Sequence, residues 1–208
     1  MAILLVRHGE TALNLARIVQ PANTPLSEIG LKQVEALAER VARDFPVRAL
    51  ATSDMLRARQ SAAPLVRRLG LVMEVEPALA ERNFGVLRGR TYESLGLDLL
   101  AMREAPEGGE SAAQFEARVA RAWSRLVRRA ALLDGDLLAI THGLVIRRLL
   151  AQHLASPLAG GAGSGEIGVG NASITVVASA APHVVHRLAC EAHLGSEAAV
   201  SPRAGGPA

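Results

Sequence analysis

The chain has 208 residues, half of them hydrophobic, and a formal net charge of +3 at pH 7. This length allows one sizeable hydrophobic core and does not demand a second domain. Aromatic residues make up only 2% of the chain and the basic residues are spread along it, so we expect no nucleic-acid partner.

The apolar stretches and the cysteine content predict a cytoplasmic protein. The apolar residues 1–6 are too few for a signal peptide, and Arg7 interrupts them. Residues 137–154 form a long apolar stretch, but charged residues break it, so we expect no membrane partner. Cys190 stands alone, which argues against a disulfide framework and fits a reducing compartment.

The basic residues are almost all arginines, since Lys32 is the sole lysine among 23 basic residues. A GC-rich coding bias is one explanation. The other is anion recognition, because a guanidinium offers phosphate a bidentate pair of hydrogen bonds that an ammonium cannot match.

The first part of the chain predicts a strand followed by a helix. Residues 2–6 form a continuous apolar run, as expected of a parallel strand buried on both faces, and Arg7 and His8 follow directly. Ser27 is suited to cap a helix with apolar positions at helical spacing, and Pro46 closes that helix.

The same pattern repeats after Pro46. Residues 48–52 predict a second strand, and Ser53 with Asp54 predicts the cap of a helix that runs to residue 69. Gly70 ends that helix, and residues 71–75 predict a further short strand.

A third strand and helix follow a loop-rich region. Ser111 and Gln114 form a capping-box pattern at the start of a long amphipathic helix. Residues 137–141 predict another parallel strand, His142 follows it at once, and residues 143–154 resume a helix.

The last part of the chain is more irregular. Residues 172–177 and 184–188 predict two paired strands at a sheet edge. The Gly-rich residues 159–170 predict a mobile connection, with a substrate lid as a lesser possibility. Residues 195–208 are small and polar and predict a disordered tail, which leaves residues 1–194 as a single domain.

This alternation of strands and helices predicts an α/β fold with a mostly parallel central sheet. Ligands of such sheets bind beyond the carboxyl ends of the strands, so Arg7, His8, Arg57 and His142 are expected to converge there.

Such a group of residues suits phosphoryl transfer. Arg7 and Arg57 would neutralise phosphate oxygens, and a neutral His8 imidazole would attack phosphorus. His142 would donate a hydrogen bond to the phosphoryl group, and a carboxyl such as Glu81 would protonate the leaving oxygen. Each of these residues also has a structural reading, as hydrogen-bonded histidines or solvated arginines.

A metal site is not expected. Arginines beside two imidazoles would set cation against cation, which disfavours a metal at these strand ends. The remaining histidines are interpreted as structural residues: His153, His183, His186 and His193.

Several segments resemble the motifs of the histidine phosphatase superfamily, also called the phosphoglycerate mutase-like superfamily, and they occur in the same order along the chain. The similarity runs from about residue 2 to residue 194 and rests on RHGETALN, TPLSEIGLKQVEALAERV, SDMLRARQSA, AERNFGVLRGRTYESL, EGGES, THGLVIR and NASITVV. The chain departs from the family pattern at Leu13, where tryptophan is usual, at Pro21, where glycine is usual, and at Asn23, where aspartate is common.

The resemblance implies a three-layer α/β/α fold and assigns roles to individual residues. His8 becomes the phosphohistidine, Glu81 the proton donor, and Arg7, Arg57 and His142 the ligands of the transferred phosphoryl group. No cofactor and no metal are implied. The expected substrate-binding residues are Asn14, as a helper, with Gln20, Arg82 and Gly143.

The family contains phosphatases and mutases. The order Glu-Arg, then an aromatic residue and glycine, at Glu81, Arg82, Phe84 and Gly85 resembles the mutases. The short segment between this loop and EGGES, together with NASITVV, resembles the phosphatases.

We therefore predict a metal-independent phosphomonoesterase of a small phosphorylated metabolite, whose identity stays open. The alternatives are a cofactor-dependent phosphoryl transfer of the phosphoglycerate mutase type and a catalytically silent phospholigand-binding module. The predicted edge hairpin makes a homodimer possible.

Overall fold

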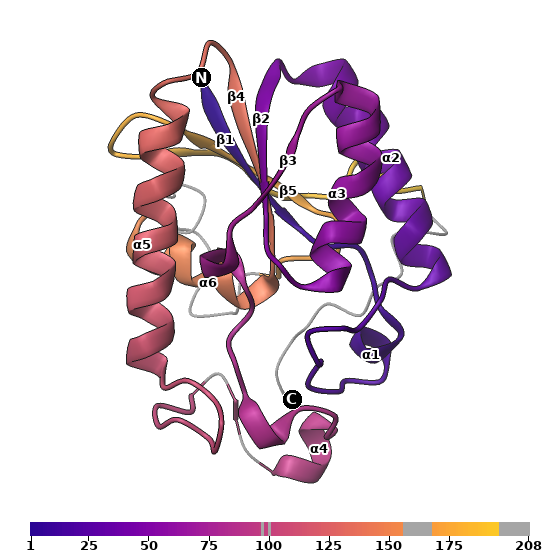
Figure 1. Ribbon diagram of the computed structural model, residues 1–208, viewed down its shortest axis with the longest axis vertical. Helices are drawn as coiled ribbons and strands as arrows, with labels where there is room; N and C mark the ends of the chain where they lie inside the picture. The colour runs from indigo at the N-terminus through magenta and orange to yellow at the C-terminus, as the bar shows by residue number, and fades with distance from the viewer. Residues whose placement is uncertain (97, 100, 156–167, 196–208) are drawn as a thin grey trace.

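A central sheet organises the chain, for which the computed structural model describes residues 1–96, 98–99, 101–155 and 168–195. Within these residues the sheet has the strand order β3-β2-β4-β1-β5-β6 (Figure 1). Strands β1 to β4 pair in parallel, whereas β5 runs antiparallel to both β1 and β6. The strands are β1 Ala2–Arg7, β2 Val47–Thr52, β3 Met73–Val75, β4 Asp136–Thr141, β5 Ile174–Ala178 and β6 Val185–Cys190. The predicted α/β fold with a mostly parallel sheet is thus confirmed.

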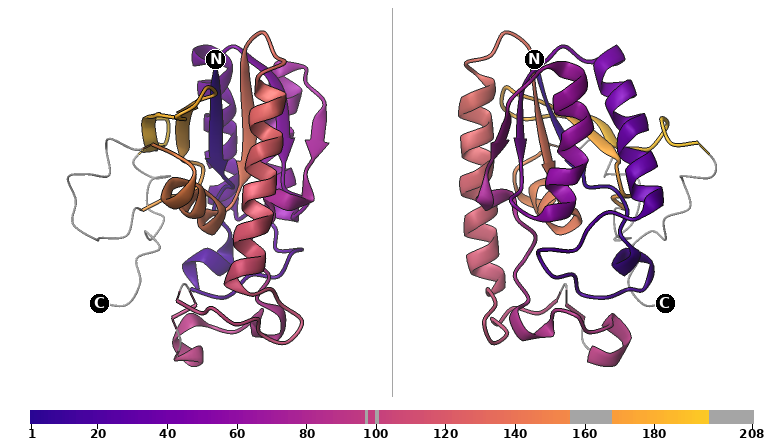
Figure 2. Two further views of the ribbon diagram at one scale, coloured as in Figure 1. Left: turned by 90° about the vertical axis from the view of Figure 1, so that its left-hand side faces the viewer. Right: turned by 45° about the vertical axis from the view of Figure 1, so that its right-hand side comes forward.

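Helices cover both faces of this sheet, as the right-hand view in Figure 2 shows for α5 on one side and α2 and α3 on the other. Residues of β1 alternate between the two faces: Ile3 and Leu5 join the core under α5 and α6, while Leu4 and Val6 join the core under α2 and α3. This alternation produces the three layers. The helices are α1 Ala12–Leu15, α2 Glu28–Asp44, α3 Leu56–Leu69, α4 Tyr92–Leu95, α5 Ala112–Ala130 and α6 Gly143–Gln152.

Two of the predicted helix starts are confirmed. The Ser27 hydroxyl accepts a hydrogen bond from the Gly30 amide at 3.0 Å at the start of α2. Ser111 and Gln114 form the reciprocal capping box of α5. These caps satisfy amides that have no partner inside the helix, and this explains why each helix begins where it does.

The predicted cap of α3 is wrong. Its N-cap is Met55, which makes no side-chain capping bond. The Ser53 hydroxyl instead accepts from the Met55 amide at 3.2 Å and lies 2.9 Å from Nε2 of His142. Ser53 therefore connects the ends of β2 and β4. The end of α3 agrees with the prediction, because Gly70 adopts the left-handed conformation with φ of 65°.

The carboxyl-terminal strands form the expected antiparallel pair at the sheet edge, with the turn at Ala181 and Pro182 between them. Residues 159–167 of the predicted Gly-rich connection and residues 196–208 of the predicted tail lie outside the described residues. The assignment of residues 1–194 to a single domain stays a prediction. Among the helices of the described residues, none combines the length and the hydropathy of a membrane span.

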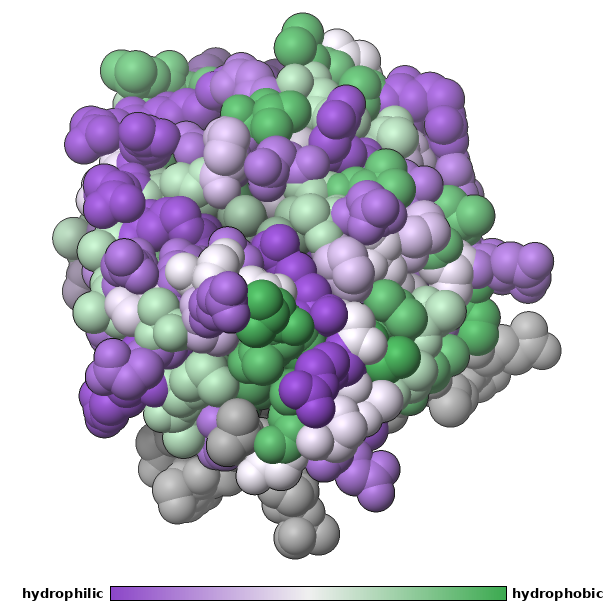
Figure 3. Space-filling model, turned by 60° about the horizontal axis from the view of Figure 1, so that its bottom comes forward, coloured by the Kyte–Doolittle hydropathy of each residue, from purple (hydrophilic) through white to green (hydrophobic). Residues whose placement is uncertain are grey.

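Neighbouring parallel strands end together at the lower end of the molecule in Figure 1, where α1 and α4 also lie. These strands are β2, β4 and β1, in the order in which they pair. Figure 3 brings this lower end forward and shows hydrophilic and hydrophobic residues interspersed on its surface. The site described below is built on these strand ends.

Candidate active site

His8 follows β1 and is buried, with 3% of its surface exposed. Its Nδ1 lies 2.7 Å from the carbonyl oxygen of Gly9, and a carbonyl can only accept, so Nδ1 carries the proton. Nε2 accepts from Nε of Arg57 at 3.2 Å. Nε2 therefore carries no proton, and its electron pair faces the Arg57 guanidinium.

Glycines allow the His8 loop to lie directly on α2. A Cβ atom at Gly9 would stand 2.8 Å from the carbonyl oxygen of Gly30, and a Cβ atom at Gly30 would stand 2.1 Å from the carbonyl oxygen of Glu10. Both distances are too short for real atoms. The amide of Ser27 also donates to the Glu10 carbonyl at 2.9 Å, so this loop and the start of α2 form one unit.

The pKa of His8 is held well below its usual value of 6.5. Burial is the largest cause, and the positive charges of Arg57 and Arg7 add to it. The ring is consequently neutral near pH 7 and can act as a nucleophile without a separate base.

Two buried guanidiniums flank this ring. Arg57 donates to the carbonyl oxygen of Pro21 at 3.0 Å as well as to His8, and Arg7 donates to the carbonyl oxygen of Val169 at 2.6 Å. Burial lowers the pKa of both arginines to about 10, so both remain charged at pH 7. Among the described residues, Nε of Arg7 has no hydrogen-bond partner.

His142 directly follows β4 and is the N-cap residue of α6, although its side chain makes no capping bond. Its ring lies close to the ring of His8. The two ring centroids of His8 and His142 are 5.1 Å apart. Burial, followed by the charge of Arg57, holds the pKa of His142 well below 6.5. Its Nδ1 is buried and makes no hydrogen bond to any described residue.

Glu81 is half-buried, and backbone amides hold its carboxyl group. Its two oxygens accept from the amides of Arg82 at 3.0 Å and Leu144 at 3.2 Å. Burial raises the pKa of Glu81, while these amides and the charges of Arg57 and Arg7 act in the opposite direction. A carboxyl group with a raised pKa is suited to donate a proton.

The predicted helper Asn14 lies in α1, whose start it caps together with Thr11. Its Oδ1 accepts from the Thr11 amide at 3.1 Å and from Nδ2 of Asn171 at 3.3 Å. The Gln20 side chain accepts from the Thr11 hydroxyl at 3.0 Å. Both predicted residues thus belong to the hydrogen-bonded loop that follows His8.

Gly143 lies beside an arginine of the site, because a Cβ atom there would stand 3.5 Å from Nε of Arg7. The Arg82 side chain, by contrast, binds backbone carbonyl groups of residues 99–110. Its buried guanidinium donates to the carbonyl oxygens of Leu99, Glu104 and Glu110 at 3.4 to 3.5 Å. Its predicted contact with substrate stays a prediction, and the contacts in the structure support a structural role.

Sequence reasoning assigned no role to Asn171, which joins the site from the segment before β5. Its amide group donates to the carbonyl oxygens of His8 at 3.0 Å and Gly9 at 3.3 Å. The Gly9 carbonyl is also the acceptor that fixes the His8 tautomer. The sequence signal for Asn171 is its place in NASITVV, the motif that matches the family pattern.

No cluster of three or more His, Cys, Asp or Glu in the described ranges is arranged to hold a metal ion. One histidine interpreted as structural, His183, packs edge-on against Trp123 with centroids 5.1 Å apart. The charged and titratable groups described above are two imidazoles held neutral by burial, two guanidiniums and a carboxyl group, and the guanidiniums suit an anionic ligand.

The sheet order and the paired histidines at its strand ends define a protein of the phosphoglycerate mutase-like fold class. Solved structures share this fold: "Mycobacterial hydrolase 1" has a TM-score of 0.72 and 30% identity, over 90% of this chain and 95% of that chain. The family model of the histidine phosphatase superfamily (branch 1) matches residues 3–188. The chain belongs to this superfamily.

Its relatives carry both phosphatase and mutase names. A mycobacterial glucosyl-3-phosphoglycerate phosphatase in complex with VO3 is 30% identical, with a TM-score of 0.71, over 85% of this chain and 90% of that chain. A probable phosphoglycerate mutase GpmB of Yersinia pestis is 34% identical over 167 residues, which cover 76% of each protein.

Proposed function

We propose that the protein is a metal-independent phosphomonoesterase that hydrolyses a small phosphorylated metabolite through a phosphohistidine. The observation that carries this proposal is the tautomer of His8, whose Nδ1–H donates to the Gly9 carbonyl oxygen while the unprotonated Nε2 accepts from Arg57. Nε2 is therefore the nucleophilic atom. Binding of substrate would exchange its contact with Arg57 for one between Arg57 and a phosphoryl oxygen.

The reaction proceeds in two steps. Nε2 of His8 attacks phosphorus as the bond to the ester oxygen breaks, and protonated Glu81 gives its proton to that oxygen, so the alcohol leaves. Water then attacks the phosphohistidine while the Glu81 carboxylate takes a proton from it. The phosphorus–nitrogen bond breaks, which releases inorganic phosphate and restores both residues.

Charge on the phosphoryl group is stabilised by Arg7, Arg57 and His142. Nε of Arg7 and Nδ1 of His142 are buried without a partner among the described residues. Such atoms are costly in a folded protein, and oxygens of a bound phosphoryl group would satisfy them. This supports an anion site between the two histidines.

The first test is phosphate release from a panel of phosphorylated metabolites in the presence of EDTA. The panel contains sugar phosphates, phosphoserine, phosphoglycerates, nucleotide-derived phosphates and glucosyl-3-phosphoglycerate, the last because of the mycobacterial relative. We expect release by the natural protein and almost none by His8→Ala. Release that EDTA abolishes would contradict the metal-independent reaction.

Phosphoglycerate mutase activity is the second candidate, favoured by the Yersinia pestis relative. A mutase would pass the phosphoryl group from His8 to a second substrate hydroxyl instead of to water. Incubation with 3-phosphoglycerate separates the two reactions, since hydrolysis yields inorganic phosphate and isomerisation yields 2-phosphoglycerate. Dominant isomerisation would overturn the phosphatase proposal, and no turnover on any compound would favour a silent binding module.

A further inference from the structure

Glu81 lies in a loop outside the strands of the sheet. The elements that flank it in the described chain are short 3-10 turns, at Pro77–Leu79 and Gly85–Leu87. A general acid must nevertheless be held within hydrogen-bond reach of the leaving oxygen. The contacts that fix this backbone are therefore important to any proton transfer by Glu81.

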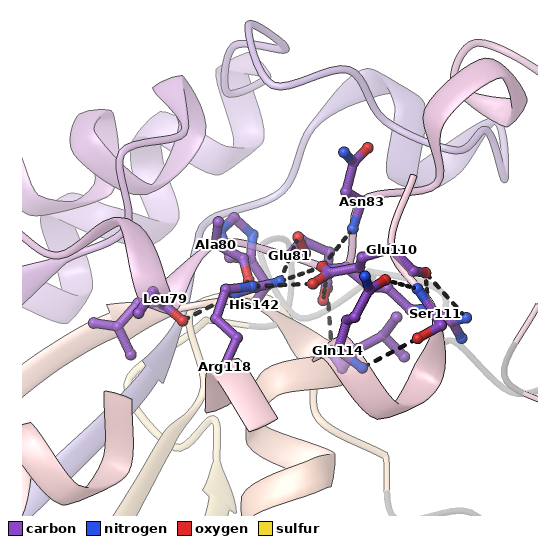
Figure 4. A network of polar contacts seen from close by, with 12 residues as sticks. Leu79, Ala80, Glu81, Asn83, Glu110, Ser111, Gln114, Arg118 and His142 are labelled. Atoms are coloured by element: carbon purple, nitrogen blue, oxygen red, sulfur yellow. Dashed lines mark hydrogen bonds and ion pairs between the residues drawn. The ribbon is translucent and has the colours of Figure 1, made fainter. Parts of the chain in front are cut away.

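The guanidinium of Arg118, in α5, forms hydrogen bonds with several backbone carbonyl groups up to and including that of Glu81. Arg118 donates to the carbonyl oxygens of Ala78 at 3.0 Å, Ala80 at 2.8 Å and Glu81 itself at 3.3 Å. Figure 4 shows Arg118 reaching from its helix toward this turn. It makes these contacts to the backbone, while the Glu81 carboxyl oxygens accept from the amides of Arg82 and Leu144.

Glu110 contacts both Arg118 and the part of the loop that follows Glu81. It forms an ion pair with Arg118, and Nε of Arg118 donates to its second oxygen at 3.2 Å. Glu110 also accepts from the amide of Asn83 at 2.8 Å (Figure 4). The pair therefore binds the backbone on both sides of Glu81: carbonyls before it and an amide after it.

The Arg118–Glu110 pair is not an ordinary surface ion pair. The two side chains are only 18% and 15% exposed, so solvent screens their interaction weakly. The same turn is also tied to the end of β4, because the Thr141 hydroxyl donates to the Leu79 carbonyl at 2.6 Å. Thr141 directly precedes His142, so the acid loop and the second histidine share one framework.

We infer that Arg118 and Glu110 are positioning residues for Glu81, which hold its backbone so that its carboxyl group meets the leaving oxygen. This inference rests on the proposed function, in which Glu81 is the proton donor. Arg118 can span three carbonyls and a carboxylate because its planar fork offers five donors. A lysine at this position retains the charge but cannot make the same set of bonds.

The test compares Arg118→Lys with Arg125→Lys. Arg125 lies on the same helix and donates to the Glu76 carboxylate at 3.0 and 3.1 Å instead of to the carbonyl oxygens that Arg118 binds, which makes it the matched control. The value of kcat/KM is measured with 4-nitrophenyl phosphate, whose leaving group barely needs a proton, and with the alkyl phosphomonoester that the panel shows to react fastest.

We expect Arg118→Lys to slow the alkyl ester by about 10- to 100-fold and the aryl ester by less than about threefold, since a small misplacement of a catalytic group has effects of this size. Arg125→Lys should change neither rate. The falling alkaline limb of kcat/KM for the alkyl ester should also move to lower pH in Arg118→Lys, because a loosened loop admits water around Glu81 and removes the burial that raises its pKa.

Equal slowing of both esters, or no slowing, would overturn the inference. Glu110→Gln provides a second variant with the same expected selectivity and keeps the test decisive if Arg118→Lys does not fold. Glu81→Gln in the same assay separates the two proposals. If Glu81→Gln shows no leaving-group selectivity, the acid role of Glu81 in the proposed function fails; if it shows selectivity that Arg118→Lys and Glu110→Gln lack, only the positioning role fails.

Discussion

Burial controls the protonation of the residues at the strand ends. His8 and His142 are almost fully enclosed and lie near the positive charge of Arg57, and both effects disfavour a positive charge on either ring. Glu81 responds in the opposite sense, because burial disfavours its negative charge. The same low-polarity surroundings thus favour a neutral nucleophile and a protonated acid, the pair that the proposed first step needs.

The lowered histidine pKa values predict a pH dependence of stability. Below the ordinary histidine pKa of 6.5, the unfolded chain takes up protons that folded His8 and His142 do not. The free energy of unfolding should therefore fall as the pH drops from about 7 to about 5.5, by up to about 1.4 kcal/mol per pH unit for each histidine. Urea unfolding measures this slope, and His142→Asn should have a shallower slope than the natural protein. Equal slopes would contradict the buried neutral state of His142.

At the scale of elements, the site depends on how the His8 loop packs against α2. The helix begins at its Ser27 cap, and the same Ser27 amide binds the Glu10 carbonyl of the loop. Gly30 then lets the first turn of α2 approach that carbonyl closely. A helix start thereby sets the position of the loop that carries the nucleophile.

This close approach predicts an unusual result for Gly30→Ala. In a solvent-exposed helix interior this change would stabilise the helix by about 1 kcal/mol. Here the new Cβ atom would stand 2.1 Å from the Glu10 carbonyl oxygen, so we expect the free energy of unfolding to fall by about 1 to 3 kcal/mol, together with a loss of activity.

Chemical denaturation and an activity assay on the same preparations test this expectation. Gly70→Ala is the control, because its Cβ atom would meet nothing within 4 Å and only its positive φ causes strain. It should cost about 1 kcal/mol and leave activity unchanged. A stabilised Gly30→Ala protein would show that the loop can move away from α2.

At the scale of the whole molecule, β4 connects the cores of both sheet faces to the site. It pairs with β1 on one side and β2 on the other, and each of its six residues is buried. Leu137 and Ala139 contact the core under α5 and α6, whereas Leu138 and Ile140 contact the core under α2 and α3. Damage to β4 should therefore reduce stability and displace His142 together.

We expect Leu138→Ala to lower the free energy of unfolding by about 2 to 5 kcal/mol, because it leaves a cavity in place of a side chain that has no solvent exposure. Leu132→Ala removes the same atoms from a side chain that is 87% exposed and should change stability by less than about 0.5 kcal/mol. Thermal or urea unfolding of both variants measures the difference. Similar losses in the two would contradict the central place of β4.

The main strands and long helices, and the group of residues at the strand ends, can be predicted from the amino-acid sequence. Buried parallel strands appear as continuous apolar runs, and capped helices begin at Ser27 and Ser111, so both can be recognised from local pattern. The carboxyl ends of parallel strands lie at one edge of the sheet. The ring centroids of His8 and His142 are accordingly 5.1 Å apart, although 134 positions separate these residues in the chain.

The contacts that support these residues cannot be predicted from the sequence, because they form between distant segments of the fold. Ser53 failed as a predicted helix cap because its hydroxyl contacts His142 from a neighbouring strand, and no local pattern specifies that partner. Asn171 donates to the carbonyl oxygen of His8, although 163 positions separate the two residues in the chain. Arg118 binds a carbonyl oxygen before Glu81 from a separate helix. Burial, and with it each shifted pKa, likewise depends on what packs around a group. Local sequence encodes the elements, because backbone geometry and side-chain polarity act over a few residues, whereas supporting contacts exist only after distant segments have packed together.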